Sequence, residues 1–390
     1  IVAMTGDGVN EIRSRYVPVV DAQMKATVRQ IRLRGMAKGR AVGVLGQWGD
    51  SITNSQAYLG SLASWGMISV PTSNGHDYGP ILLWMGASPG GDQNPLRLFK
   101  GGNYCNDSGW TVPAGLSALD DAINRANPSW SLTMFGTNDI RRNEWNPEAY
   151  RTLLTRFIQA NIEEGIVPVL STIPPCVGYD TNVGQANTVV REVGGTMGIP
   201  VVDLHGLFMD LHPDDWSSVL LSDGVHPSHS YGSGDLSDDS LRNDGYNIRS
   251  VLTLDIAEKL KRIIFDNGVA EGGESAPIVS VSSSSHPYLD LNFGMQVSVH
   301  MAHESGPTPD GYSWVMDSSP FTMPDTTVEG TSSSVVISAP SAGDWFFHVR
   351  ARSGNAWGPV VHLPVAVCAH PTVRIQRRSV NQLMVADSFI

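Results

Sequence analysis

The chain has 390 residues, an apolar content of 41% and a formal net charge of −12 at pH 7. This length predicts two or three domains, and the apolar fraction is sufficient for a large core. The negative charge argues against nucleic acid or an anionic membrane surface as the main partner. No run of about 18 apolar residues is present, so no membrane span is expected.

The cysteines and the start of the chain carry little functional signal. Cys105, Cys176 and Cys368 form neither a disulfide framework nor a CxxC metal motif, although one disulfide among them stays open. The chain begins at Ile1 without an initiator Met or a signal peptide, so we expect either a trimmed chain or a mature form, and the start of the chain does not indicate the compartment. We expect no cofactor and no metal site.

The first strand leads into a polar turn. A helix is expected over 21–38, and the apolar run 41–46 between glycines indicates a buried strand. The turn Gly49–Thr53 follows it, at the end of the strand where open α/β sheets place their ligand crevice. Ser51 in this turn is a candidate nucleophile, although a lone Ser after a strand is more often a helix N-cap. A helix is expected over 56–65, followed by a long loop rich in Gly and Pro.

From residue 111 to residue 265, helices and strands alternate. Helices are expected over 114–126, 147–164, 187–197 and 245–265, and strands over 131–135, 166–170 and 199–204. This alternation predicts a parallel sheet that is covered by helices on both faces.

The composition changes after residue 266, and the helical period disappears. The Gly/Glu/Ser-rich stretch 269–276 is typical of a linker. Short alternating runs separated by turn signals then predict a smaller all-β sandwich over 277–369. The run Trp345–Arg352 resembles a late strand pair of fibronectin-type-III or immunoglobulin-like modules. The expected division is therefore an N-terminal arm and helix (1–40), an α/β domain (41–268), the linker, the β module and a tail (370–390).

Polar motifs follow the strands of the α/β domain. Gly136–Asp139 (GTND) comes directly after a predicted strand, and Asp223–Pro227 (DGVHP) lies on a loop before the last helix. Together with Gly49–Thr53 (GDSIT) and the stretch 106–111, they resemble, in order, the four blocks of the SGNH (GDSL-type) hydrolase family of esterases and lipases. The resemblance covers about residues 12 to 268 and implies a flavodoxin-like three-layer α/β/α sheet. No GxSxG elbow is present, which argues against the α/β-hydrolase fold.

The resemblance implies a role for each block. Ser51 would attack an acyl carbonyl, His226 would remove its proton, and Asp223 would orient the imidazole. The backbone N–H groups of Ser51 and Gly109, with the Asn138 amide, would form the oxyanion hole. Because the second block is short and variable, Gly101 or Gly102 stays an alternative to Gly109.

Structural interpretations compete with these roles. Asn138 and Asp139 could cap a helix, and Asp223 with His226 could be a turn motif. The inserted loop 228–243 is rich in Ser, Gly and Asp, and its spacing matches no EF-hand. A solvated acidic loop is the simpler interpretation, with Ca²⁺ binding by its aspartates as the alternative.

The function expected first is a secreted carbohydrate esterase that removes acetyl groups from an acylated polysaccharide or a small ester. A lipase, lysophospholipase or thioesterase of the same family is the alternative, and an apolar lid near Trp84–Met85 would favour it. A catalytically inactive glycan-binding protein is the third hypothesis. The β module could contact polysaccharide through Trp314, Trp345 or Trp357, although such tryptophans more often belong to the core.

Overall fold

The computed structural model describes residues 12–60, 62, 72–73, 75–86, 105–231, 234–266, 268, 270–271, 276–286, 294–319 and 322–367. Gly101, Gly102, Cys368 and the expected tail lie outside these residues. The chain divides into two compact units, one made of residues 1–20 and 31–268 and the other of residues 21–30 and 269–390. Among the described residues, no helix is both long and apolar enough to cross a bilayer.

The first unit is built on a four-stranded parallel sheet with the order β1-β4-β5-β6. Its strands are β1 (Ala41–Gly49), β4 (Pro128–Met134), β5 (Val167–Ser171) and β6 (Val201–Val202). All residues of β4 and β5 are buried, as expected for strands covered on both faces. The prediction of a parallel α/β sheet is confirmed.

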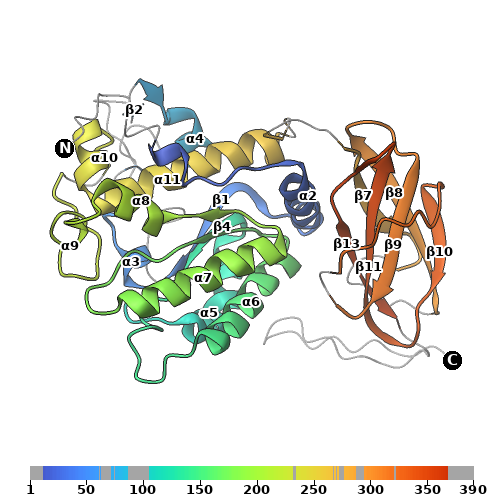
Figure 1. The fold of residues 1–390 in the computed structure, drawn as a ribbon, viewed down its shortest axis with the longest axis horizontal. Helices are drawn as coiled ribbons and strands as arrows, with labels where there is room; N and C mark the ends of the chain where they lie inside the picture. The colour runs from blue at the N-terminus through green and yellow to red at the C-terminus, as the bar shows by residue number, and fades with distance from the viewer. Residues whose placement is uncertain are drawn as a thin grey trace. The chain divides into compact units, whose positions relative to one another are not determined.

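Helices flank this sheet (Figure 1). Helices α5 (Val112–Ala126), α6 (Pro147–Glu163) and α7 (Asp180–Met197) lie on one side of β1 and β4, and α11 (Gly245–Leu260) lies on the other. The remaining helices are α2 (Ala22–Ala37), α3 (Ser51–Asn54), α4 (Gly79–Trp84), α8 (Leu204–Leu211), α9 (Trp216–Val219) and α10 (Asp238–Asn243). A π-helical turn (Lys261–Phe265) extends α11, and β2 (Thr72–Ser73) pairs with β3 (His76–Asp77).

Polar contacts fix the sheet core around two large side chains. Trp48 and Trp130 are completely buried. The indole N–H of Trp48 donates to Asn161 Oδ1 (2.8 Å), and that of Trp130 donates to the Gly43 carbonyl (3.0 Å). Because a buried indole N–H without a partner would be costly, these bonds set the orientation of both rings.

Helix α11 is buried almost all round rather than along one stripe. Of its 16 residues, 13 are buried, including the polar Asn247, Arg249, Ser250 and Thr253. A helix of this kind belongs to the interior of a large domain. Its polar side chains must therefore find partners inside the protein, and several of these partners belong to the segment around Ser51.

The helix predicted over 56–65 does not begin at residue 56. Residues 56–59 form a turn, residues 60 and 62 have 3₁₀ conformation, and a separate four-residue helix, α3 (Ser51–Asn54), comes before them. Asp50 caps α3 by accepting a hydrogen bond from the Ile52 N–H (3.0 Å). Residues 61 and 63–65 lie outside the described part of the chain.

The second unit is all β, as predicted. One antiparallel sheet has the order β10-β8-β7, and in the other β11 pairs with β9, β12 and β13. The strands are β7 (Ile278–Ser283), β8 (Gln296–Ser305), β9 (Gly311–Asp317), β10 (Ser334–Ser338), β11 (Gly343–Ser353), β12 (Ala356–Trp357) and β13 (Val361–Val367).

Side chains from both sheets form one core in this unit. Phe347 and Val349 of β11 are buried with Val297, Val299 and Met301 of β8. Trp314 and Trp345 are partly buried and pack against this cluster. Trp357 is half-buried, and the Arg350 guanidinium lies over its ring, 4.8 Å from the ring centroid.

Candidate active site

The turn that carries Ser51 begins where β1 meets β4. Gly49 is the last residue of β1 and pairs with Met134 of β4. A Cβ atom at Gly49 would lie 2.2 Å from Thr53 Oγ1 and 2.6 Å from the Met134 carbonyl oxygen. Only glycine therefore lets the chain turn this close to the neighbouring strand, and Ser51 follows as the first residue of α3.

Three predicted site residues meet at this turn. Ser51 Oγ lies 2.9 Å from Nε2 of His226, and Nδ1 of His226 lies 2.7 Å from Asp223 Oδ2. The other carboxylate oxygen of Asp223 accepts the backbone N–H groups of Val225 (3.0 Å) and His226 (2.7 Å). The loop therefore fixes the carboxylate on one side of the imidazole while the hydroxyl lies on the other.

The carboxyl group of Asp223 is held in its ionised form. Partial burial opposes ionisation, but the hydrogen bonds from the backbone and ring of His226 and from Val225 outweigh it and lower the pKa of Asp223 to about 2. The Asp223 side chain is 55% exposed and that of His226 is 35% exposed. The pair therefore lies at the rim of the site, in contact with solvent.

Asn138 and the loop before α5 meet beside the end of β1. The side-chain amide of Asn138 donates to the Trp110 carbonyl (3.0 Å), which fixes its orientation. This loop is tied to β1, because the Gly49 N–H donates to the Cys105 carbonyl (3.0 Å). Gly109 lies in the same loop, is exposed and has a φ of +78°, a conformation that favours glycine. The expected second block thus lies close to the third.

Two buried carboxyl groups lie behind this surface. Asp50 is completely buried, and Asp139 accepts the Val112 N–H (3.2 Å). Burial raises the pKa of each to about 6, and the charge of Asp50 adds to the shift of Asp139. In both residues Oδ2 is buried without a hydrogen-bond partner among the described residues. The structural interpretation of Asp139 is therefore supported, since it binds the first turn of α5.

The sequence patterns missed Arg249 of α11. Its Nη1 donates to the Ile52 carbonyl (2.7 Å) and its Nη2 to Thr53 Oγ1 (2.8 Å). One sequence feature could have indicated it. The apolar positions of this helix leave no face for solvent, so a charged residue within it is expected to be buried. Asn54 was also missed, and its amide donates to Asp107 of the second block (3.2 Å).

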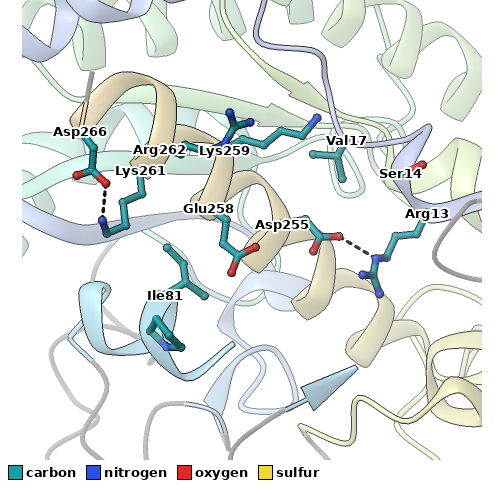
Figure 2. A pocket seen from close by; sticks show the side chains of 11 residues that line it. Arg13, Ser14, Val17, Ile81, Asp255, Glu258, Lys259, Lys261, Arg262 and Asp266 are labelled. Atoms are coloured by element: carbon teal, nitrogen blue, oxygen red, sulfur yellow. Dashed lines mark hydrogen bonds and ion pairs between the residues drawn. The ribbon is translucent and has the colours of Figure 1, made fainter. Parts of the chain in front are cut away.

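Two of the cavities in the described part of this unit have no predicted triad residue in their lining. One of about 550 Å³ is lined by residues of α4, of α11 and of the N-terminal segment, with Arg13 paired to Asp255 at 2.8 Å (Figure 2). None of the predicted site residues lines it. The other, of about 340 Å³, is lined by Asp139 and by polar and aromatic residues of the following loop, among them Arg142 and Trp145. Asp139, the residue after Asn138, thus lines the second cavity.

The described residues hold no group of three or more His, Cys, Asp and Glu side chains that could bind a metal ion. In the inserted loop, Asp235 accepts the Ser237 N–H (2.9 Å), and directly after the loop Asp244 caps α11 by accepting the Asn247 N–H (3.0 Å). These aspartates therefore stabilise local backbone. Cys105 and Cys176 are buried free thiols.

Comparison with known protein families indicates which class of protein this is. Residues 100–230 match the model of the GDSL-like Lipase/Acylhydrolase family. The chain contains a GDSL-like lipase/acylhydrolase domain. It is accordingly a hydrolase, and the family supports hydrolysis of the esterase/lipase type. The match includes Asn138, Asp223 and His226 of the GDSL-like domain, whereas Ser51 precedes the matched residues.

Solved structures are similar at low identity. The lipase/acylhydrolase from Enterococcus faecalis is 20% identical, with a TM-score of 0.38 and coverage of 55% of this chain and 95% of that chain. The esterase EstA from Pseudoalteromonas sp. is 14% identical, with a TM-score of 0.37 and coverage of 56% and 97%. The acetyl xylan esterase AlAXEase is 14% identical, with a TM-score of 0.39 and coverage of 55% and 98%. No curated protein matches this sequence.

Proposed function

We propose that the GDSL-like domain is a serine esterase in which Ser51 is the nucleophile, His226 the general base and Asp223 the residue that orients the base. The observation that carries this proposal is the continuous series of contacts from Ser51 Oγ through the His226 ring to Asp223 Oδ2, at 2.9 and 2.7 Å. A hydroxyl becomes a good nucleophile only when a base removes its proton, and an imidazole titrates in the range where this works.

In the first half of the reaction, Ser51 Oγ attacks the carbonyl carbon of the ester as its proton passes to His226 Nε2. The ionised Asp223 accepts the Nδ1–H, which keeps Nε2 free to take the proton. The carbonyl oxygen becomes negative, and the Ser51 N–H, the Gly109 N–H and the Asn138 amide are proposed to donate to it. His226 then protonates the leaving alcohol, and an acyl-Ser51 ester remains.

In the second half, water replaces the alcohol. His226 Nε2 removes a proton from the water as its oxygen attacks the acyl carbon, and the same donors stabilise the negative charge. The proton returns from His226 to Ser51 Oγ as the carboxylic acid leaves. Each residue thus returns to its starting state without a cofactor.

For the substrate, we propose acetyl esters of carbohydrates. The supporting observation is that the polar side chains of His226 and Asp223 are in contact with solvent. An open, polar rim suits a hydroxyl-rich alcohol that stays hydrated. A long acyl chain would instead need apolar surface to leave water.

The lipase alternative depends on an apolar lid near Trp84 and Met85. Met85 is completely buried, and the Trp84 ring contacts the rings of Trp130 and Phe265 at centroid distances of 6.4 and 5.0 Å. Met85 is therefore part of the core, and the partly buried Trp84 ring packs on neighbouring aromatic rings instead of forming a free apolar lid. This observation favours the carbohydrate esterase over the lipase.

The test uses p-nitrophenyl acetate with the wild type and Ser51→Ala. We expect hydrolysis by the wild type and a loss of at least about 10³-fold in kcat for the variant. Equal, slow hydrolysis by both would refute catalysis and favour the inactive glycan-binding protein. A series of p-nitrophenyl esters with longer acyl chains, beside acetylated xylan, then tests the substrate: preference for long chains would contradict the acetyl proposal.

We also propose that the all-β unit is a fibronectin-III/immunoglobulin-like module that contacts polysaccharide and that the protein is secreted. The half-buried Trp357 beneath Arg350 supports the contact, since sugar rings pack on such partly exposed aromatic surfaces. We expect Trp357→Ala to weaken retention of the full chain on insoluble xylan, with Trp314→Ala as the control. Unchanged retention, or none by the wild type, would contradict the contact.

A further inference from the structure

The helix that carries the proposed nucleophile is too short to hold itself in place. Helix α3 has four residues, and an isolated helical turn is unstable in water because its nucleation is costly. Its position must therefore be set by contacts with other elements. Asp50 caps its start, Asn54 at its end donates to Asp107, and α11 contacts the two residues between Ser51 and Asn54.

Three side chains of α11 hold the segment that follows Ser51. The Arg249 guanidinium donates to the Ile52 carbonyl (2.7 Å) and to Thr53 Oγ1 (2.8 Å). Ser250 Oγ accepts the Leu59 N–H (3.2 Å), and Thr253 Oγ1 lies 3.0 Å from the Tyr58 hydroxyl. The contacts of Arg249 are the ones on α3 itself, one and two residues after Ser51.

The surroundings of Arg249 are unusual for a charged side chain. It is almost completely buried, its guanidinium lies 3.7 Å from the centroid of the Tyr58 ring, and its Nε has no hydrogen-bond partner. Among the described residues it forms no ion pair with a carboxylate. Arg13, the other buried arginine against α11, differs because it pairs with Asp255 (Figure 2). Burying a cation without such a pair costs free energy, and a nearby negative charge lowers that cost.

The nearby anion is Asp50, the residue before Ser51. Burial raises the pKa of Asp50, and the positive charge of Arg249 acts in the opposite direction and lowers it. His226 faces Asp50 from the loop after Asp223, and Asp139 faces it from the loop after β4. Tyr150 of α6 and Tyr246 of α11 also face it. Of these groups, Arg249 alone carries a permanent positive charge.

We propose that Arg249 is a positioning residue for Ser51. Its guanidinium holds α3 through the Ile52 carbonyl and Thr53 Oγ1, and it faces the buried carboxyl group of Asp50 with a fixed positive charge. This inference rests on the proposed function. The two hydrogen bonds of the guanidinium keep Ser51 Oγ within reach of His226, and the charge keeps Asp50 ionised as the acceptor that caps α3. Without that charge, Asp50 takes up a proton at higher pH and its hold on the Ile52 N–H weakens.

The experiment compares Arg249→Gln, Arg249→Lys and Thr53→Val with the wild type, using p-nitrophenyl acetate over a range of pH. For Arg249→Gln we expect kcat to fall about 10- to 100-fold, with KM changed little, since a small displacement of a reacting group has effects of this size. We also expect the acid limb of the kcat profile to move upward by about half a pH unit or more. Arg249→Lys keeps the charge, so its acid limb stays while its kcat falls less.

Arg13→Gln is the matched control, because it removes a buried arginine that contacts the same helix at a different place. It should lower the melting temperature without moving the acid limb. The inference is overturned if folded Arg249→Gln keeps the wild-type kcat and acid limb, or if Arg13→Gln moves the limb equally. If Arg249→Gln does not fold, wild-type kcat in both Arg249→Lys and Thr53→Val overturns it. A wild type without esterase activity refutes the proposed function itself, which separates the two failures.

Discussion

Ser51 and His226 are 175 residues apart in the sequence, yet Oγ of the first lies 2.9 Å from Nε2 of the second. Ser51 follows β1, and His226 lies on the loop before α10 and α11. Neither loop could form this contact alone. It depends on the parallel strands ending at one edge of the sheet, where α11 joins the two loops.

The first prediction concerns Asp223→Asn. The amide keeps the size of the carboxylate but offers a donor where the His226 Nδ1–H needs an acceptor. The imidazole therefore carries its proton on Nε2, and Nε2 can no longer accept the proton of the Ser51 hydroxyl. We expect kcat to fall about 10²- to 10⁴-fold. The control is Asp215→Asn, which changes a second His–Asp pair at the same spacing (His212 Nδ1 to Asp215 Oδ1, 2.8 Å). Unchanged kcat in Asp223→Asn, or equal losses in both variants, would count against the triad.

The second prediction concerns the oxyanion hole. Asn138→Ala removes a neutral donor that the Trp110 carbonyl already orients. We expect kcat to fall about 10²- to 10³-fold, with KM nearly constant, because the donor acts on the charge that develops in the transition state. Asn182→Ala is the control, since Asn182 donates to the Ile140 carbonyl (3.0 Å) in the same loop region but away from Ser51. A higher KM with normal kcat would instead assign Asn138 to ground-state binding.

The third prediction concerns the turn at the end of β1. In Gly49→Ala the new methyl group must displace Thr53 or the β4 backbone, and α3 moves with it. We expect a loss of about 10²-fold in kcat and of about 1–3 kcal/mol in the free energy of unfolding. Gly184→Ala, on the exposed face of α7 with open space around its Cβ position, should leave kcat unchanged. If Gly49→Ala kept full activity, the close approach of β1 to β4 would not be what positions Ser51.

The fourth prediction concerns pH and stability. The pKa of Asp139 is raised from 3.8 to about 6 in the folded protein, so the folded state holds this proton more tightly than the unfolded chain does. The contribution of Asp139 to stability is therefore present below about pH 4 and is lost as the pH rises through about 6. Asp139→Asn keeps the acceptor for Val112 without the charge, and should be more stable than the wild type at pH 8 by about 1–3 kcal/mol, but not at pH 4.

Urea unfolding at both pH values measures this difference. Asp120→Asn, on the exposed surface of α5, controls for the change in net charge and should unfold like the wild type at each pH. Lower stability of Asp139→Asn at pH 8 would show that the carboxylate is needed there in its charged form.

Much of the fold could be predicted from local patterns. The apolar runs before Gly49 and Gly136 predicted β1 and β4, because strands buried on both faces need continuous apolar or small residues. Pro147 predicted the start of α6, because proline is tolerated in the first turn of a helix. Asn146, which was not predicted as the cap, accepts two backbone N–H groups there. The candidate site was predicted because the motifs around Ser51, Asn138 and His226 together resemble the blocks of the SGNH hydrolase family; a polar turn after a strand would not alone have assigned these roles.

The rest depended on partners that are distant in the sequence. The pattern over 56–65 favoured a helix, but residues 56–59 form a turn, and the Asp50 cap begins a separate helix at Ser51. Arg249 lies 197 residues from Ile52, and no local period indicates that contact. The raised pKa values of Asp50 and Asp139 likewise follow from burial, which the sequence of a polar turn does not reveal.

The near-complete burial of α11 has a consequence for how the enzyme would lose activity on warming. Arg249 of α11 binds the turn after the proposed nucleophile, and α11 begins beside the loop that carries the proposed base, where the Tyr246 N–H donates to the Ser228 carbonyl (3.0 Å). Any fluctuation that detaches α11 exposes a large apolar surface and should separate both proposed catalytic groups at once. The amides of α11 should accordingly exchange with solvent only through the most costly cooperative openings, so that inactivation and global unfolding coincide.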